Sequence, residues 1–329
     1  MHLLVLGGGG FLGYAAVTEA LTAGHEVTVL SREGKAPVEG VEALRGDRTG
    51  DLAALHGREF DGCLDTFSDP DAVAATAQLL DGHVGAYGYI SGMSVYAPDG
   101  PRVPNESAPV RVEGRYDDVL QDRSVAKLAC EAALAEHFSG PRLVTRVGIM
   151  VGPRDPSDRF TWWPVRLARA LAGTADRQVL APGDPGRAVQ YTDVRDLAGW
   201  MVGMLAAGCG GLFNGVGPGR PDTVGEILDA CLRAAGGEAG DVEFVWADES
   251  EMRSALAEAL PDEESRPLWF PEDQIPQDAI DSSAALAAGL TFRSAEQTAR
   301  DTLAWAAERE LSAGFGPDLE RALRRRAGA

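Results

Sequence analysis

A run of glycines near the N-terminus has the spacing of a phosphate-binding turn. Gly7, Gly10 and Gly13 form a GxxGxxG pattern between an apolar run and a helical pattern. The first glycine permits the tight turn, the second lets the backbone approach a pyrophosphate, and the third lets helix and strand pack closely. The N–H groups of Phe11 and Leu12, at the start of the helix, then face the phosphates with the aid of the helix dipole. The pattern predicts a bound dinucleotide of the NAD(P) type.

A lysine in an arginine-biased chain is the second feature that could take part in chemistry. Only Lys35 and Lys127 are lysines among the 30 basic residues. Lys127 lies in a strongly amphipathic helical pattern, one turn after Arg123, and its presence there suggests that an ammonium is needed. Arginine stays protonated at any working pH. Arg123 can therefore pair with a carboxylate, a phosphate or a developing oxyanion, but it cannot cycle as a proton donor and acceptor.

The elements that must position these residues alternate between strand-like and helical patterns, which is typical of a parallel sheet covered by helices. We expect strands over 3–6, 26–30, 41–45, 62–66, 87–90, 143–147 and 211–216, and helices over 11–23, 71–80 and 123–137. This order predicts an α/β fold with a doubly wound parallel (Rossmann) sheet over residues 1–152, to which 188–216 returns.

The amino-acid composition of the chain changes after residue 152. Segments rich in Pro, Gly, Asp and Trp interrupt shorter helices, and the chain becomes acidic and mostly helical beyond residue 218. We therefore expect 153–187 and 217–329 to form a smaller, mostly helical substrate domain. The arginine-rich stretch 321–326 is expected to be a solvated helix end.

The composition excludes several classes of protein. A net charge of −20 repels phosphate backbones and anionic membrane surfaces, which argues against nucleic acid or a membrane as a partner. The four cysteines form no CxxC pair, and the five histidines form no metal-spaced group, so neither a metal site nor a disulfide framework is expected. The first apolar run is short and lacks a basic start, which disfavours a signal peptide. We expect a cytoplasmic protein with a small-molecule substrate, and a homodimer is compatible with this.

The end of the second predicted strand bears on the choice of cofactor. An acidic residue there would hold the ribose hydroxyls of NAD. This chain instead has Ser31 and Arg32, and arginine suits a 2′-phosphate. NADP is therefore favoured over NAD, with a surface arginine beside a loop as the alternative explanation.

Three further motifs carry a resemblance to a known family. They are ISGMSVY at 90–96, KLACE at 127–131, and QYTDVRDLA at 190–198, with 146–153 similar to an RPxNxxGP segment. Together with the glycine pattern, they resemble the extended short-chain dehydrogenase/reductases, the NAD-dependent epimerase/dehydratase family, over most of the chain. Within that family, the chain looks most similar to bacterial proteins described only as reductases or epimerases. The resemblance implies an oxidoreductase or epimerase in biosynthesis.

The resemblance also implies a Ser/Thr–Tyr–Lys triad, in which Tyr is the acid/base, Lys lowers the pKa of that Tyr and holds the nicotinamide ribose, and Ser/Thr orients the substrate. The Ser/Thr position, four residues before Tyr96, is Gly92, and the Tyr position, four residues before Lys127, is Arg123. Only Lys127 matches. Three hypotheses follow. Hydride transfer persists with Tyr96, Ser94, Tyr116 or solvent supplying protons; or a non-redox elimination, isomerisation or cyclisation uses Arg123 as an electrostatic stabiliser; or the chain binds a dinucleotide without catalysis.

Other residues are candidates for the substrate or cofactor site, each with a structural alternative. Asp47 resembles the family's adenine-contacting acid, with a cap as the alternative. Trp162 and Trp163 suit an aromatic pocket wall, although packing explains them equally well. Arg187 suits an anionic substrate or the cofactor pyrophosphate, and a structural ion pair is the alternative. Gly92 and Tyr116 are expected near the substrate, because Gly92 removes a hydroxyl and opens space beside the nicotinamide.

Overall fold

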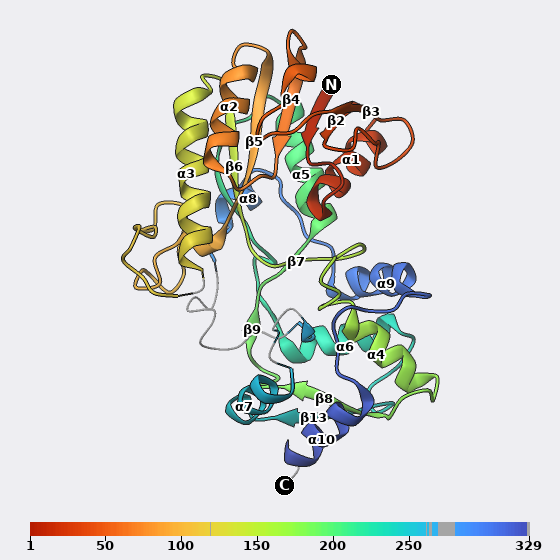
Figure 1. Cartoon of the computed structure of the whole chain (residues 1–329). Coiled ribbons are helices and arrows are strands. Elements are labelled where there is room, and N and C mark those ends of the chain that lie inside the picture. The colour runs from red at the N-terminus through yellow and green to blue at the C-terminus, as the bar shows by residue number, and fades with distance from the viewer. Residues whose placement is uncertain (119, 261, 263–264, 269–279, 328–329) are drawn as a thin grey trace. The chain divides into compact units, whose positions relative to one another are not determined.

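The computed structural model describes residues 1–118, 120–260, 262, 265–268 and 280–327, which form two compact units. Unit 1 comprises Met1–Ile149, Val194–Gly219 and Ile280–Thr291, and unit 2 comprises Met150–Asp193, Arg220–Ala279 and Phe292–Ala329. Each unit has its own strands and helices and is described by itself (Figure 1).

Unit 1 is built on a seven-stranded sheet in which all neighbours are parallel, with the strand order β11-β6-β5-β4-β1-β2-β3. The strands are β1 (His2–Leu6), β2 (Glu26–Ser31), β3 (Glu42–Arg45), β4 (Phe60–Asp65), β5 (Val84–Gly92), β6 (Arg142–Val147) and β11 (Gly211–Gly215). The order reverses between β1 and β4, the place where open α/β sheets bind ligands beyond the carboxyl ends of their strands. The predicted doubly wound Rossmann sheet is confirmed.

Helices cover both faces of this sheet. They are α1 (Phe11–Thr22), α2 (Pro70–Leu80), α3 (Gln121–His137), α5 (Val194–Ala206) and the short α8 (Ser283–Ala287), with single 3₁₀ turns at η1 (Ala53–Leu55) and η2 (Met93–Val95). Helices α2 and α3 pack together on one face, and α1 packs against α5 on the other (Figure 1). Gly62 and Gly88 lie under Leu205 of α5, so that helix can approach the sheet closely.

Local sequence explains where the first elements begin and end. Residues 3–6 of β1 are fully buried, as expected for a central parallel strand covered on both faces. Helix α2 begins where Asp69 accepts a hydrogen bond from the backbone N–H of Ala72 (3.0 Å), with Pro70 in its first turn. Strand β5 is longer than the expected 87–90, because β4 and β6 pair with it on both sides. Among the described helices, none is long and apolar enough to cross a bilayer.

The boundaries of the units differ from the expected domains by three residues at 150–152 and 217–219, and by more in two other segments. Residues 280–291 were expected in the C-terminal domain but belong to unit 1, where Trp200 donates to the Ala288 carbonyl (3.0 Å) and the Asn214 amide donates to the Asp281 carbonyl (2.9 Å). Residues 188–193 were expected to return to the sheet but lie in unit 2. Their short strands pair with other strands of unit 2. The sequence did not predict this, because a side-chain pattern does not reveal the partner of a two-residue strand.

Unit 2 combines short two-stranded sheets with helices. Strand β7 (Met150–Val151) pairs in parallel with β10 (Thr192–Asp193), β8 (Gln178–Pro182) in parallel with β13 (Glu243–Ala247), and β9 (Ala188–Val189) antiparallel with β12 (Asp222–Thr223). The helices are α4 (Trp162–Leu171), α6 (Val224–Ala234), α7 (Glu249–Ala259), α9 (Ala295–Ala306) and α10 (Pro317–Ala327).

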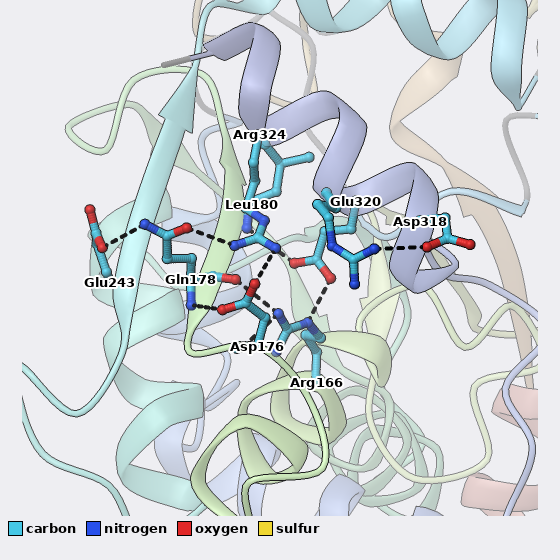
Figure 2. A network of polar contacts seen from close by, with 9 residues as sticks. Arg166, Asp176, Gln178, Leu180, Glu243, Asp318, Glu320 and Arg324 are labelled. Atoms are coloured by element: carbon cyan, nitrogen blue, oxygen red, sulfur yellow. Dashed lines mark hydrogen bonds and ion pairs between the residues drawn. The ribbon is translucent and has the colours of Figure 1, made fainter. Parts of the chain in front are cut away.

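Helix α10 is fixed within unit 2 by two ion pairs, of which the Arg166–Glu320 pair is buried (Figure 2). Glu320 is 4% exposed; it accepts from Arg166 at 2.8 Å and from the Leu180 backbone N–H at 3.2 Å. Arg324 pairs with Asp176 at 2.6 Å and is 7% exposed. The expectation of a fully solvated helix end was therefore wrong for Arg324, because the helix turns this side chain toward β8, whereas 325 and 326 are exposed.

Loss of Glu320 should destabilise unit 2. We expect Glu320→Ala to lower the free energy of unfolding by about 3–5 kcal/mol, since it leaves the buried Arg166 guanidinium without its carboxylate. Asp318→Ala on the same helix is the matched control; its side chain is 97% exposed, so the expected loss is below about 1 kcal/mol. Urea denaturation measures both, and equal losses would contradict a buried role for Glu320.

Candidate functional site

The glycine turn has a backbone that other residues could not adopt. Gly7 has φ +95°, in the region that favours glycine. A Cβ on Gly13 would lie only 2.3 Å from the carbonyl oxygen of Gly7, and a Cβ on Gly8 would lie 2.8 Å from Val29. Around Gly9 there is nothing within 4 Å, and the position of a Cβ on Gly10 meets only the Gly7 carbonyl at 3.5 Å. The turn is therefore closed toward the sheet and open toward the far side, as a phosphate cradle requires.

The start of α1 places the first backbone N–H groups of a helix next to this turn. Gly10 is the N-cap and contributes no side-chain hydrogen bond, and no acidic residue lies in the first turn. The first N–H groups of a helix have no partner within the helix and carry partial positive charge. Phe11 is half-buried and Leu12 is buried, so both are anchored by packing. The residues present fit the phosphates of a dinucleotide.

The ends of β2 and β3 place three predicted cofactor residues at the same edge of the sheet. Ser31 ends β2, and the side chain of the following Arg32 is exposed. Asp47 follows β3, where its carboxylate accepts from the N–H (3.0 Å) and hydroxyl (2.8 Å) of Thr49. These bonds, with a smaller contribution from Arg32, lower the pKa of Asp47. Asp47 is thus an ionised carboxylate capping its own turn, beside a solvent-accessible arginine.

Lys127 lies beneath the ends of β4 and β5. Its Nζ donates to the Ile90 carbonyl at 2.6 Å and to the Phe67 carbonyl at 3.3 Å, and it lies 5.0 Å from the centre of the Tyr89 ring. The residue is only 7% exposed. Burial is the main reason that the pKa of Lys127 falls from 10.5 to about 8. The structure thus holds an amine with a pKa of about 8 at the carboxyl edge of the sheet.

Neither of the two positions at which the resemblance implies a hydroxyl carries one. Gly92 leaves space, and Arg123 places a positive charge. Gly92 is the last residue of β5, with extended backbone (φ −141°, ψ 150°). A Cβ there would meet the Ser94 hydroxyl at 3.6 Å and the Val147 carbonyl at 3.8 Å, both ordinary contacts. Arg123 lies on α3 one turn before Lys127 and is exposed. Ser94, in the turn after β5, is half-buried.

The two tyrosines proposed as proton sources both have acceptors of their own. Tyr96 is 2% exposed and donates to the Asn214 Oδ1 at 2.6 Å. Burial raises the pKa of Tyr96. Tyr116 is half-buried and donates to the Asp99 carboxylate, a bond that raises the pKa of Tyr116. Neither hydroxyl is therefore tuned toward ionisation near neutral pH.

The remaining candidates for substrate contact belong to unit 2. Trp162 and Trp163 are 4% and 3% exposed and pack edge to face at 4.8 Å, and Trp163 donates to the Leu268 carbonyl at 3.0 Å. Their rings lie within the packing of unit 2. Arg187 precedes β9 and is half-buried. Unit 1 therefore brings together the glycine turn, the ends of β2 and β3, Gly92 and Lys127, and not these three residues.

The structure adds functional candidates that the motifs did not indicate. Arg48, directly after Asp47, pairs with Asp65 at 2.7 Å, and Asp65 is completely buried at the end of β4. The Thr66 hydroxyl and Arg48 Nη1 both donate to the Leu6 carbonyl at 3.3 Å. The available signal was a carboxylate at the buried end of β4, after the apolar residues Cys63 and Leu64. Arg48 also lines a cavity of about 650 Å³ between the loop after β3 and the first turns of α2.

The lowered pKa of Lys127 predicts how stability depends on pH. Between about pH 8 and 10.5, the unfolded chain binds a proton at this lysine that the folded chain does not. The contribution of Lys127 to stability therefore rises with pH across this window, and below it the full cost of burying the ammonium is present. We expect the difference in free energy of unfolding between wild type and Lys127→Met to rise by on the order of 3 kcal/mol across this window.

Urea denaturation at a series of pH values measures this difference, in which the other titrations cancel. The chain provides a matched control, because its other lysine, Lys35, has a side chain that is 78% exposed. Wild type minus Lys35→Met should show no such rise. A flat Lys127 curve would contradict the burial of its ammonium.

Comparison with known proteins identifies the fold. No family model and no curated protein matches the sequence. Among solved structures, a Burkholderia cenocepacia J2315 protein assigned as an epimerase has a TM-score of 0.65 at 18% identity, covering 93% of this chain and 98% of that one. UDP-glucose 4-epimerase from Bifidobacterium longum, in complex with NAD⁺ and UDP, gives 0.62 at 18% identity over 94% and 99%.

A human epimerase family protein with NADPH gives a TM-score of 0.59 at 20% identity, covering 92% of this chain and 99% of that one. Identities at this level establish a shared fold. The resemblance that the sequence motifs indicated is confirmed at that level. This chain shares its fold with these epimerase structures.

Proposed function

We propose that this chain binds NADP at the carboxyl edge of the unit 1 sheet, with NAD as the alternative cofactor. The observation that carries the proposal is the glycine turn, in which a Cβ on Gly13 would collide with the Gly7 backbone at 2.3 Å while the side facing α1's first turn stays open. Structures with the same fold hold NAD⁺ or NADPH. The exposed Arg32 after β2 favours the cofactor that carries a 2′-phosphate.

The activity we propose is a reductase or epimerase type of tailoring step on a small polyoxygenated or anionic metabolite in biosynthesis. Support comes from Lys127, whose ammonium is held below the strand ends by two carbonyl oxygens. A lysine so placed keeps a positive charge beside the site and offers its remaining N–H to an oxygen atom. A bound nicotinamide would supply the hydride chemistry. Sugar nucleotides are the substrate class suggested by structures of this fold.

The protein lacks the usual hydroxyls for moving a proton in such a step. Tyr96 and Tyr116 donate to Asn214 and Asp99 respectively. This leaves Ser94, half-buried beside Gly92, and solvent as the proton sources that the geometry favours. A serine hydroxyl does not ionise in this range, so it would relay a proton rather than store one.

A non-redox elimination, isomerisation or cyclisation is the second candidate function, and Arg123 is the observation that favours it. Its guanidinium is exposed one helical turn from Lys127 and is permanently charged. Such a pair can stabilise an oxyanion or carboxylate without any proton transfer of its own. The third candidate is dinucleotide binding without catalysis, and the absence of turnover would distinguish it from the other two.

A titration followed by turnover tests these candidates. We expect purified protein to bind NADPH, seen as a change in its fluorescence, and to bind NADH more weakly. With NADP⁺ and UDP-glucose as a first probe, a net change at 340 nm supports dehydrogenase or reductase chemistry. Because an epimerase returns the hydride that it takes, product without a net change supports epimerisation if UDP-glucose deuterated at C4 reacts more slowly, and supports the non-redox candidate if it reacts at the same rate. No binding of either nucleotide would contradict the proposed function.

Removal of Arg123 tests its place in the chemistry. We expect Arg123→Ala to lower turnover at least about tenfold if the guanidinium stabilises a developing charge, with little change in stability because the side chain is exposed. Arg321→Ala is the matched control for loss of one exposed arginine and should leave turnover unchanged. Unchanged turnover in Arg123→Ala would remove this residue from the mechanism.

The pair Gly92→Ser and Arg123→Tyr tests whether ordinary family chemistry can be restored. Both residues should be accepted, since a Cβ on Gly92 makes only ordinary contacts and position 123 is exposed. The double variant should melt within a few degrees of wild type. We expect it, and neither single variant, to turn over UDP-glucose with NADP⁺ faster than wild type. A folded, NADP-binding double variant without this gain would show that the substrate site differs as well.

A further inference from the structure

A guanidinium lies at the point where the strand order of the sheet reverses. Strand β1 has β2 on one side and β4 on the other, and Leu6 of β1 is in register with Asp65 of β4. Arg48 bridges these two strand ends. Its Nη1 donates to the Leu6 carbonyl at 3.3 Å and to the Asp65 Oδ1 at 2.7 Å. Ligands of open α/β sheets bind beyond this crevice, so Arg48 occupies the centre of the proposed cofactor site.

The position of Arg48 is rigidly determined. Its guanidinium lies over the Phe67 ring at 4.0 Å. Asp65 is 0% exposed, and it also accepts from the Phe67 backbone N–H at 2.9 Å and from the Tyr87 hydroxyl at 2.8 Å. A carboxylate held by three donors has one orientation, and it holds the arginine in turn. Such preorganisation lowers the entropy lost when a ligand binds.

The guanidinium retains donors that nothing in the described part of the chain uses. Its hydrogen bonds within that part all come from Nη1. Nη2 lies 3.2 Å from the position of a Cβ on Gly7, so this edge of Arg48 faces the first glycine of the turn. The side chain is 17% exposed, which leaves the edge accessible.

We propose that Arg48 is a phosphate-binding residue, whose Nη2 edge donates to the diphosphate of the bound dinucleotide, and that Asp65 positions it. The inference rests on the proposed dinucleotide binding. Arg32, at the end of β2, then serves the 2′-phosphate of NADP, while Arg48 serves the diphosphate that NAD and NADP share. The two arginines therefore have separable effects on affinity.

The alternative role of Arg48, to neutralise the buried Asp65, explains less of the geometry. A lysine could supply that charge, but its single nitrogen offers no second fixed edge. The planar guanidinium binds Asp65 with one nitrogen and presents another toward Gly7, as Arg does when it binds phosphate and carboxylate groups. In a chain with a net charge of −20, a local cation also offsets the unfavourable field on an anionic ligand. Arg48 also lines a cavity of about 650 Å³, which leaves room for a ligand on that side of the guanidinium.

Dissociation constants for three ligands test the proposal without any measurement of activity. The ligands are NADPH, NADH and ADP-ribose, of which all carry the diphosphate and only NADPH carries the 2′-phosphate. Arg48→Lys is the main variant, because it keeps the charge opposite Asp65 and removes the second edge. We expect it to weaken all three ligands by about tenfold to a hundredfold, the effect of one charge-assisted hydrogen bond. Arg32→Met should weaken NADPH alone.

Folding is controlled by a second variant and by thermal melting. Arg48→Met with Asp65→Asn removes both charges, so that no buried carboxylate is left unpaired. It should show the same loss of affinity for all three ligands. Adenosine, which has no phosphate, should bind every folded variant as it binds wild type.

The outcomes separate this inference from the proposed function. Wild-type affinity for all three ligands in folded Arg48→Lys would overturn the inference and leave Arg48 as the counter-charge of Asp65. Tighter binding would overturn it by showing that Arg48 occludes the site, and a loss confined to NADPH would assign it to the 2′-phosphate instead. Failure of the wild-type protein to bind any of the three ligands would overturn the proposed function itself, and this inference with it.

Discussion

The close approach between the backbones of Gly7 and Gly13 is the constraint on which the rest of unit 1 depends. Because no Cβ separates them, α1 starts directly above the end of β1 and aims its first N–H groups along the carboxyl edge of the sheet. The same placement lets α1 pack against α5 on one face while α2 and α3 cover the other (Figure 1). One steric requirement thus determines both the packing of a layer and the position of the candidate phosphate cradle.

Two cations are fixed at that edge by different means. The ammonium of Lys127 is bound by backbone carbonyls at the ends of β4 and β5, and burial lowers its pKa to about 8. The guanidinium of Arg48 is bound by the buried Asp65 and the Leu6 carbonyl and stays charged. Carbonyl oxygens hold a cation in place without neutralising its charge. A carboxylate neutralises most of the charge, and what remains is a guanidinium whose free N–H groups point in a fixed direction. The first arrangement suits proton-linked chemistry, and the second suits the orientation of a bound anion.

Gly92 and Arg123 stand where the resemblance implies hydroxyls, and the fold accommodates both. Gly92 keeps the extended backbone of β5, and Arg123 occupies an exposed turn of α3, so both are accommodated without strain. The Tyr96 hydroxyl is buried and donates to Asn214, so it is not tuned to replace such a hydroxyl. A fold can therefore retain its cofactor architecture while its proton chemistry moves to other groups or disappears.

The succession of strands and helices along the first half of the chain and the glycine turn were predicted from sequence alone, because each depends on local periodicity and on residues with special backbone freedom. The structure confirms the fold that they predicted. Lys127 and Gly92 were found through motif spacing for the same reason. Only the tertiary structure revealed the Arg48–Asp65 pair, whose members are 17 residues apart and join at the crevice between β1 and β4. It also decided that residues 280–291 belong to unit 1 and that Trp162 is enclosed in unit 2. Such facts depend on which distant surfaces meet, and a one-dimensional pattern of polarity does not encode that.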